Sequence, residues 1–163
     1  MALYGLSVIV TIAVFYIMNE LTAPLLNTDY RGGNGNPALF FPVVLMPFIF
    51  YFLYGTIELS LRIANKWLSH RKTIIVMLVC LIYAICIALW TIRAANKFRT
   101  DIVNTKDAYG DPAEFALLNV FSNHLFFNPF TFLGVVAICF VVGAVWSLGR
   151  KGKSQNGKVN AFQ

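Results

Sequence analysis

The stretch that decides the fold is residues 73–92, TIIVMLVCLIYAICIALWTI, a run with no charged side chain. About 20 apolar residues are what one α-helix needs to cross the hydrocarbon core of a bilayer. In water such a helix would expose apolar side chains on every face. We therefore interpret this stretch as a transmembrane crossing.

The composition of the whole chain agrees with this interpretation. Of its 163 residues, 58% are apolar and only 12% are charged, whereas soluble globular domains carry about 25% charged residues. This difference excludes a soluble globular domain and a disordered chain. The three cysteines lie inside apolar runs and not in loops, which excludes a secreted scaffold built on disulfides.

Three further apolar runs predict three further crossings, at residues 2–18, 38–61 and 129–148. The first run has no basic residue before it and no small-residue cleavage site after it, so we interpret it as a retained helix and not as a signal peptide. The sequence thus predicts an all-α integral membrane protein with four transmembrane helices. They form a single domain over residues 1–149, followed by a flexible basic tail at 150–163.

Basic residues predict the orientation of these helices. The connection at residues 62–72 and the tail at 150–163 are both rich in Lys and Arg, which favours the cytoplasm for both. Both termini are therefore expected inside, with two external loops at about 19–37 and 93–128. The net charge of +6 then belongs to the inner face, where anionic lipid headgroups attract it. It gives no reason to expect a nucleic-acid partner.

The second external loop contains a helix signal. Asp111 is a suitable N-cap, Pro112 suits the first helical position, and Glu114 lies three residues after the cap. Leu118 and Phe121 follow with helical spacing on an apolar side. We expect a short amphipathic helix here, lying at the outer membrane surface as a lid.

Three ionisable residues near the membrane boundaries are candidate functional residues. Glu58 and Arg62 are four residues apart near the cytoplasmic end of the second crossing, where a simple ion pair is the structural alternative. Glu20 is a single acid at the outer end of the first crossing. Ionisable groups within a membrane are functional candidates by default, as proton relays or cation sites.

Prolines and small residues are further candidates. Pro42 and Pro47 interrupt the backbone hydrogen bonds of the second crossing, so we expect a bend there. Ala84 in the third crossing and Gly143 in the fourth belong to stripes of small residues that allow helices to approach closely. The partner helix can belong to the same bundle or to another subunit.

No catalytic motif, cofactor motif or metal-ligand spacing is present in the sequence, so we expect no cofactor and favour a protein that is not an enzyme. The preferred hypothesis is an accessory, regulatory or immunity-type subunit of a larger complex in a bacterial plasma membrane. Its expected partners are the lipid bilayer and another membrane protein or a second copy. The first alternative is a small oligomeric transporter or channel using Glu20, Glu58 and the bent crossing. The second is a lipid-modifying enzyme using Asp29, Asp107 and Asp111.

The predicted orientation can be tested by cysteine labelling. We expect a cysteine at position 107 in place of Asp107 to react with an impermeant thiol reagent on intact cells, and one at position 70 in place of His70 to react only after lysis. Cys80, Cys86 and Cys139 are first replaced by serine, which we expect the protein to tolerate. Labelling at position 70 on intact cells would invert the topology.

Overall fold

In a computed structural model, residues 1–23, 36–105, 111 and 116–160 are described, with side chains in the last helix described as far as Arg150. These residues form helices and no strand. The elements, in chain order, are α1 (Ala2–Glu20), η1 (Pro37–Leu39), α2 (Phe40–Val44), α3 (Met46–Lys66), α4 (His70–Thr105), α5 (Asn123–Phe126) and α6 (Pro129–Asn160).

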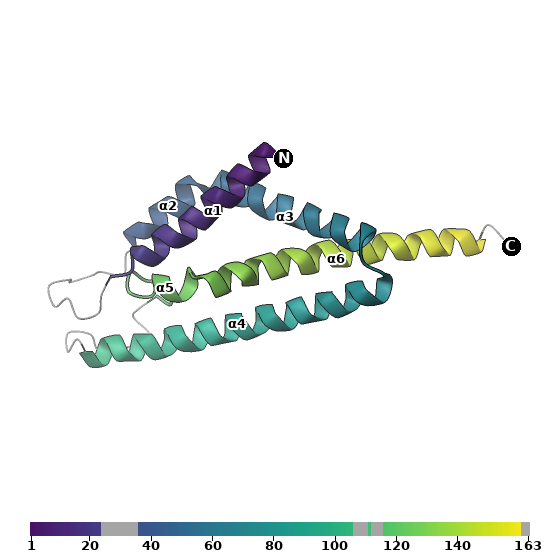
Figure 1. Ribbon diagram of the computed structural model, residues 1–163. Helices are drawn as coiled ribbons and strands as arrows, with labels where there is room; N and C mark the ends of the chain where they lie inside the picture. Colours follow the sequence, from purple (N-terminus) through teal and green to yellow (C-terminus); the bar gives the residue numbers. More distant parts are fainter. Residues whose placement is uncertain (24–35, 106–110, 112–115, 161–163) are drawn as a thin grey trace.

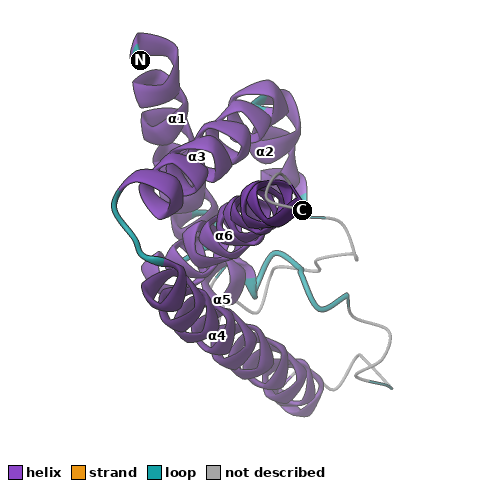
Figure 2. Cartoon of the chain, turned by 90° about the vertical axis from the view of Figure 1, so that its right-hand side faces the viewer, coloured by secondary structure: helices purple, strands orange, loops and turns teal. Residues whose placement is uncertain are grey.

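Helix α6 lies at the centre of the arrangement (Figure 1). It packs against α3 on one side and against α4 on the other, and α1 packs mainly against α3. Seen from the side in Figure 2, the order α1, α3, α6, α4 forms an open layer and not a closed four-helix bundle. Among the described helices, much of α4 consequently has no neighbour.

The number of apolar helices agrees with the predicted crossings. Three helices are long and apolar enough to cross a membrane, and a fourth crossing is obtained if α2 and α3 with their preceding turn count as one bent span. Two helices are longer than expected. With 36 residues, α4 is about 54 Å long at 1.5 Å per residue. Helix α6 continues to Asn160, so residues 150–160 are helical.

The expected bend in the second crossing is present. The chain turns by 57° between α2 and α3, and the break falls at Leu45, between the two prolines. Pro47 has no N–H to donate to the carbonyl of Val43, so the helical hydrogen bonds cannot continue through this point. A new helix starts at Met46 with Pro47 in its first turn, where a missing donor costs little.

The buried face of α3 carries small or hydroxyl side chains at every fourth position after Phe52, namely Thr56, Ser60 and Ala64. Thr56 Oγ1 donates to the carbonyl of Phe52 at 2.7 Å, and Ser60 Oγ donates to that of Thr56 at 2.7 Å. The hydroxyls are therefore satisfied within their own helix. The small side chains allow neighbouring helices to approach closely.

Gly143 lies where α6 comes close to the backbone of α3. A Cβ atom at this position would be 2.8 Å from the carbonyl oxygen of Ile57 and 2.8 Å from the amide nitrogen of Leu61. One turn further, Ser147 Oγ donates to Asn65 Oδ1 at 2.6 Å. The two helices are thus in contact through their backbones.

The prediction of an amphipathic helix in the second loop is wrong for the part of this loop that the structure describes. Residues 112–115 lie outside the described residues, while 116–122 form turns and only one helical turn, α5, follows. Asn119 and Ser122 explain the difference. Asn119 Oδ1 accepts from the amide of Phe121, and Ser122 Oγ accepts from the amide of Asn119 and also lies within hydrogen-bonding distance of the Leu117 carbonyl. These local bonds replace the i to i−4 bonds of a helix.

The close contact at Gly143 can be tested with a matched pair of glycine substitutions in α6. We expect Gly143→Ala to destabilise the protein by about 1–3 kcal/mol, because the added methyl group meets backbone atoms that cannot move aside easily. Gly149→Ala, in the same helix, meets nothing within 4 Å and should be neutral or slightly stabilising through helix propensity. The measurement is the thermal unfolding midpoint in detergent, and equal midpoints for the two variants would contradict this account.

Candidate functional site

An apolar pocket with a volume of about 550 Å³ lies between α1 and α6. One face of α1 and the first turns of α6 form its walls, and the turn before α6 closes one end. Pockets of 300–1,000 Å³ are typical of small-molecule sites. The lining residues are Ile12, Phe15, Tyr16, Asn19, Glu20, Phe127, Asn128, Pro129, Phe132 and Leu133.

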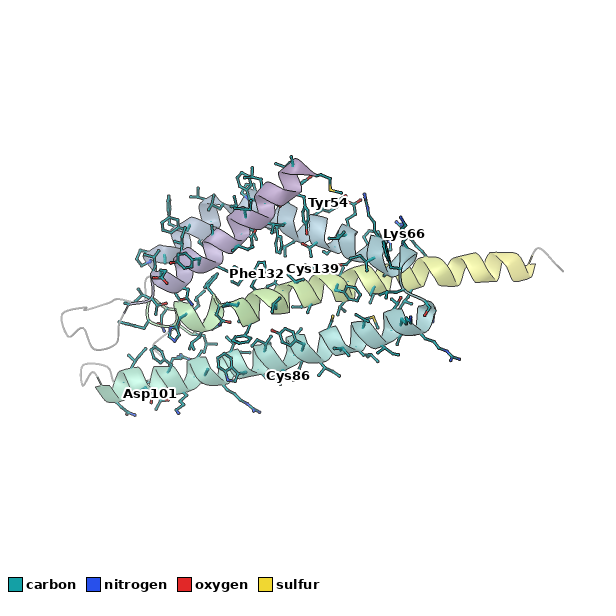
Figure 3. All side chains as sticks on the ribbon, in the orientation of Figure 1. Tyr54, Lys66, Cys86, Asp101, Phe132 and Cys139 are labelled. Carbon is teal, nitrogen blue, oxygen red and sulfur yellow. The ribbon has the colours of Figure 1, made fainter. Side chains whose placement is uncertain are left out.

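Aromatic rings form the inner wall of the pocket. The ring of Phe15 makes edge contacts with Phe127 and with Phe132, each with centroids 5.3 Å apart. Phe132 also stacks on Phe52 of α3 at 5.6 Å, and Figure 3 shows Phe132 on α6 between the helices. These contacts tie the wall of the pocket to the core and give it a fixed shape.

Two asparagines at the end of the pocket are used by the fold itself. Asn19 Nδ2 donates to the carbonyl of Phe127 at 2.8 Å. Asn128 caps α6, because its Oδ1 accepts from the amides of Phe130 and Thr131 at 3.0 and 3.1 Å. Its Nδ2 donates to carbonyls of the preceding turn. These side chains position the two helices and leave little capacity for a ligand.

Glu20 is different from the asparagines. Its side chain is exposed, and within the described part of the chain its carboxylate has no hydrogen bond or ion pair. It is the last residue of α1, where the helix dipole is negative, and no basic residue lies in this last turn. Tyr16, one turn earlier, lines the same pocket. Within the described residues, the site therefore joins an apolar pocket to one carboxylate that has no partner.

A network of hydrogen bonds holds the polar end of α1 against the turn before α6. Asn36 Nδ2 donates to Asn123 Oδ1 at 2.6 Å, and the amide of His124 donates to Thr22 Oγ1 at 2.9 Å. The amide of Ala23 donates to the carbonyl of Val120 at 2.9 Å. This network was missed by sequence reasoning. The only sequence signal was the density of Asn, Ser and Thr side chains in two segments far apart in the chain.

The other predicted ionisable pair lies away from the pocket. Glu58 and Arg62 form an ion pair on the outer surface of α3, with 41% and 67% of their side chains exposed. Tyr4, near the start of α1, lies within hydrogen-bonding distance of Thr56 Oγ1, so the part of α3 two residues before Glu58 packs against the first turns of α1. Glu20 ends that helix, 16 residues after Tyr4 and about 24 Å further along its axis. The structure therefore does not bring Glu20 and Glu58 together.

The remaining candidates have structural positions. Pro42 and Pro47 flank the bend, and Gly143 lies in the contact between α6 and α3. Ala84 is 7% exposed, in a part of α4 that packs on α6. Ile87, one turn further along α4, touches the position of Gly134. The stripes of small residues are thus used between helices of the same chain.

Metal and redox chemistry find no support in the described residues. They contain no group of three His, Cys, Asp or Glu side chains with metal-binding geometry, and the three cysteines are unpaired. Of the three acids considered for a lipid-modifying enzyme, Asp29 and Asp107 lie outside the described residues, and Asp111 is exposed.

Comparison with protein families, with curated proteins and with solved structures finds no match. The pocket is therefore interpreted from its own chemistry. None of its lining residues forms a nucleophile and base pair. An apolar cavity with a single carboxylate at its end has the chemistry of a binding site for an amphipathic ligand.

The cap of α6 can be tested by substitution. We expect Asn128→Ala to lower the stability by about 1 kcal/mol, because the first amides of α6 lose their acceptor. Asn128→Ser restores a capping oxygen and should recover most of this loss. Thermal unfolding in detergent measures both. A serine variant as unstable as the alanine variant would show that the cap is not the main role of Asn128.

Proposed function

We propose that this protein is a multi-pass membrane protein of a bacterial plasma membrane that acts as a non-enzymatic subunit of a larger membrane complex, with an accessory, regulatory or immunity-type role. Its helices expose large apolar side chains on their outer faces, which suits a lipid environment. Such exposed apolar faces also suit packing against another membrane protein, which supports a role in assembly.

The observation that carries the proposal is the open packing of α4. Only 11% of the most apolar stretch of this helix is buried, compared with 33% in α6. Its main neighbours are α6 and α5, so most of its surface is available to another membrane helix. Cys86 lies on this outer surface, on the side of α4 away from α6 (Figure 3).

Exposed residues of α4 recur with the spacing of a helix packing seam. Ile75, Val79 and Ile82 are each 61% exposed, and Leu89 is 50% exposed. Their separations, with the exposed Cys86 included, alternate between four and three residues, which is the repeat of left-handed helix pairs. We propose that a transmembrane helix of a different protein packs along these five residues, which we call the outer face of α4.

The transporter alternative has less support. A coupled transport path needs its ionisable groups along one route. Glu20 is at the end of α1, whereas Glu58 is in α3, close to the part of that helix that contacts the start of α1. The Glu58–Arg62 pair is exposed, and such i, i+4 pairs contribute only about 0.3–0.5 kcal/mol. The arrangement therefore favours a structural role for this pair.

A substitution on the outer face of α4 tests the proposed function. We expect Ile82→Trp to reduce the partner recovered with the tagged protein at least tenfold, because the larger ring prevents close helix packing. Ile9→Trp is the matched control, since Ile9 is 66% exposed on α1, and it should leave recovery unchanged. The measurement is the stoichiometry of the complex after purification in mild detergent.

Both variants are expected to keep the thermal midpoint of the native protein, so a lost complex is distinguished from a lost fold. The proposal is wrong if the native protein purifies without a stoichiometric foreign subunit. It is also wrong if Ile82→Trp leaves such a complex intact.

A further inference from the structure

The pocket beside Glu20 lies at a defined depth along α1. This helix has 19 residues, so it is about 28 Å long, close to the 30 Å or so of a bilayer's hydrocarbon core. Glu20 at its end then stands at the level of the lipid headgroups. The pocket extends from Glu20 back to Ile12, about 12 Å into the apolar region.

We propose that this pocket binds one acyl chain of a phospholipid whose headgroup carries an ammonium group, with the Glu20 carboxylate pairing with that ammonium. The proposal relies on the membrane location in the proposed function, but not on the partner subunit. The lipid chain would lie against the ring of Phe15 and the side chains of Ile12 and Leu133. The headgroup would lie beside Glu20 and Tyr16.

The size of the pocket favours a lipid chain over a protein helix. An α-helix with its side chains is about 10 Å across, whereas the wall of this pocket extends only about 12 Å along α1, from Glu20 to Ile12. A hydrocarbon chain is thinner and flexible, and it fits along a narrow apolar wall. Lipid chains also surround a membrane helix at this depth, so the ligand is present at high concentration.

The charge at the pocket favours an ammonium headgroup over an anionic one. Glu20 adds a negative charge to the negative end of the α1 dipole, and no basic side chain lies in that last turn. An ammonium group would neutralise this charge, whereas a headgroup with a net negative charge would be repelled. Tyr16, one turn from Glu20, adds an aromatic face that also attracts cations.

The test compares two phospholipids with identical acyl chains, phosphatidylethanolamine and phosphatidylglycerol, added to the detergent-solubilised full-length protein. Native mass spectrometry measures the bound fraction of each. We expect the native protein to bind phosphatidylethanolamine at least fivefold more tightly. Glu20→Gln should abolish this preference, because it removes the charge and keeps the shape. Glu58→Gln, a matched acid substitution outside the pocket, should leave the preference unchanged.

A second variant separates the chain from the headgroup. Leu133→Trp places a larger side chain in the pocket and should weaken binding of both lipids at least fivefold. The proposal is overturned if the native protein shows no headgroup preference, if Glu58→Gln removes the preference as Glu20→Gln does, or if Leu133→Trp leaves lipid binding intact. It is also overturned if a second copy of the chain occupies the pocket, seen as a dimer that Leu133→Trp dissociates.

The outcome is independent of the partner subunit. Lipid binding is measured on the isolated chain, and Ile82→Trp should keep the headgroup preference while losing the complex. If the native protein purifies without a foreign subunit but keeps its lipid preference, only the proposed function is rejected. A retained complex without a lipid preference would reject the lipid site alone.

Discussion

The backbone contact between α6 and α3 at Gly143 is the constraint on which the rest of the structure depends. It brings two helices to a distance that no larger residue at this position permits. In lipid, apolar side chains gain little by leaving their surroundings, so van der Waals contact between backbones is a principal source of helix association. With α6 fixed on α3, α4 packs on the other side of α6 and α1 packs on α3. The open layer follows from this order.

Hydrogen bonds of asparagine side chains hold α1 and α6 in register at the end of the molecule where α1 ends and α6 begins. Direct contacts between these two helices are few. At this end, however, Asn19 Nδ2 donates to the carbonyl of Phe127, just before α6, and Asn123 Nδ2 donates to the carbonyl of Leu21, the C-cap residue of α1. Buried amide groups are costly unless they are paired, so this network tolerates few alternative arrangements. It keeps the helices joined at one end and leaves the pocket between them.

The sequence was sufficient for features that depend on apolar length and on proline. Four apolar runs and the bend beside Pro47 could be predicted because each depends on one local rule. The turn at 116–122 could not, since the local bonds of Asn119 and Ser122 compete with a helix signal at Asp111. The pocket could not be predicted either. It depends on Phe15 meeting Phe127 and Phe132 from a distant part of the chain.

The use of small residues inside the chain changes where a partner should be sought. Had the stripes around Ala84 and Gly143 been free, they would have been the natural surface for another subunit. Both are occupied by helices of the same chain. Among the exposed apolar surfaces of the described residues, the outer face of α4 is the one proposed for a partner helix, and the pocket beside Glu20 is distinguished by its carboxylate. These surfaces belong to different helices, so the proposed partner helix and the proposed lipid would not compete for the same site.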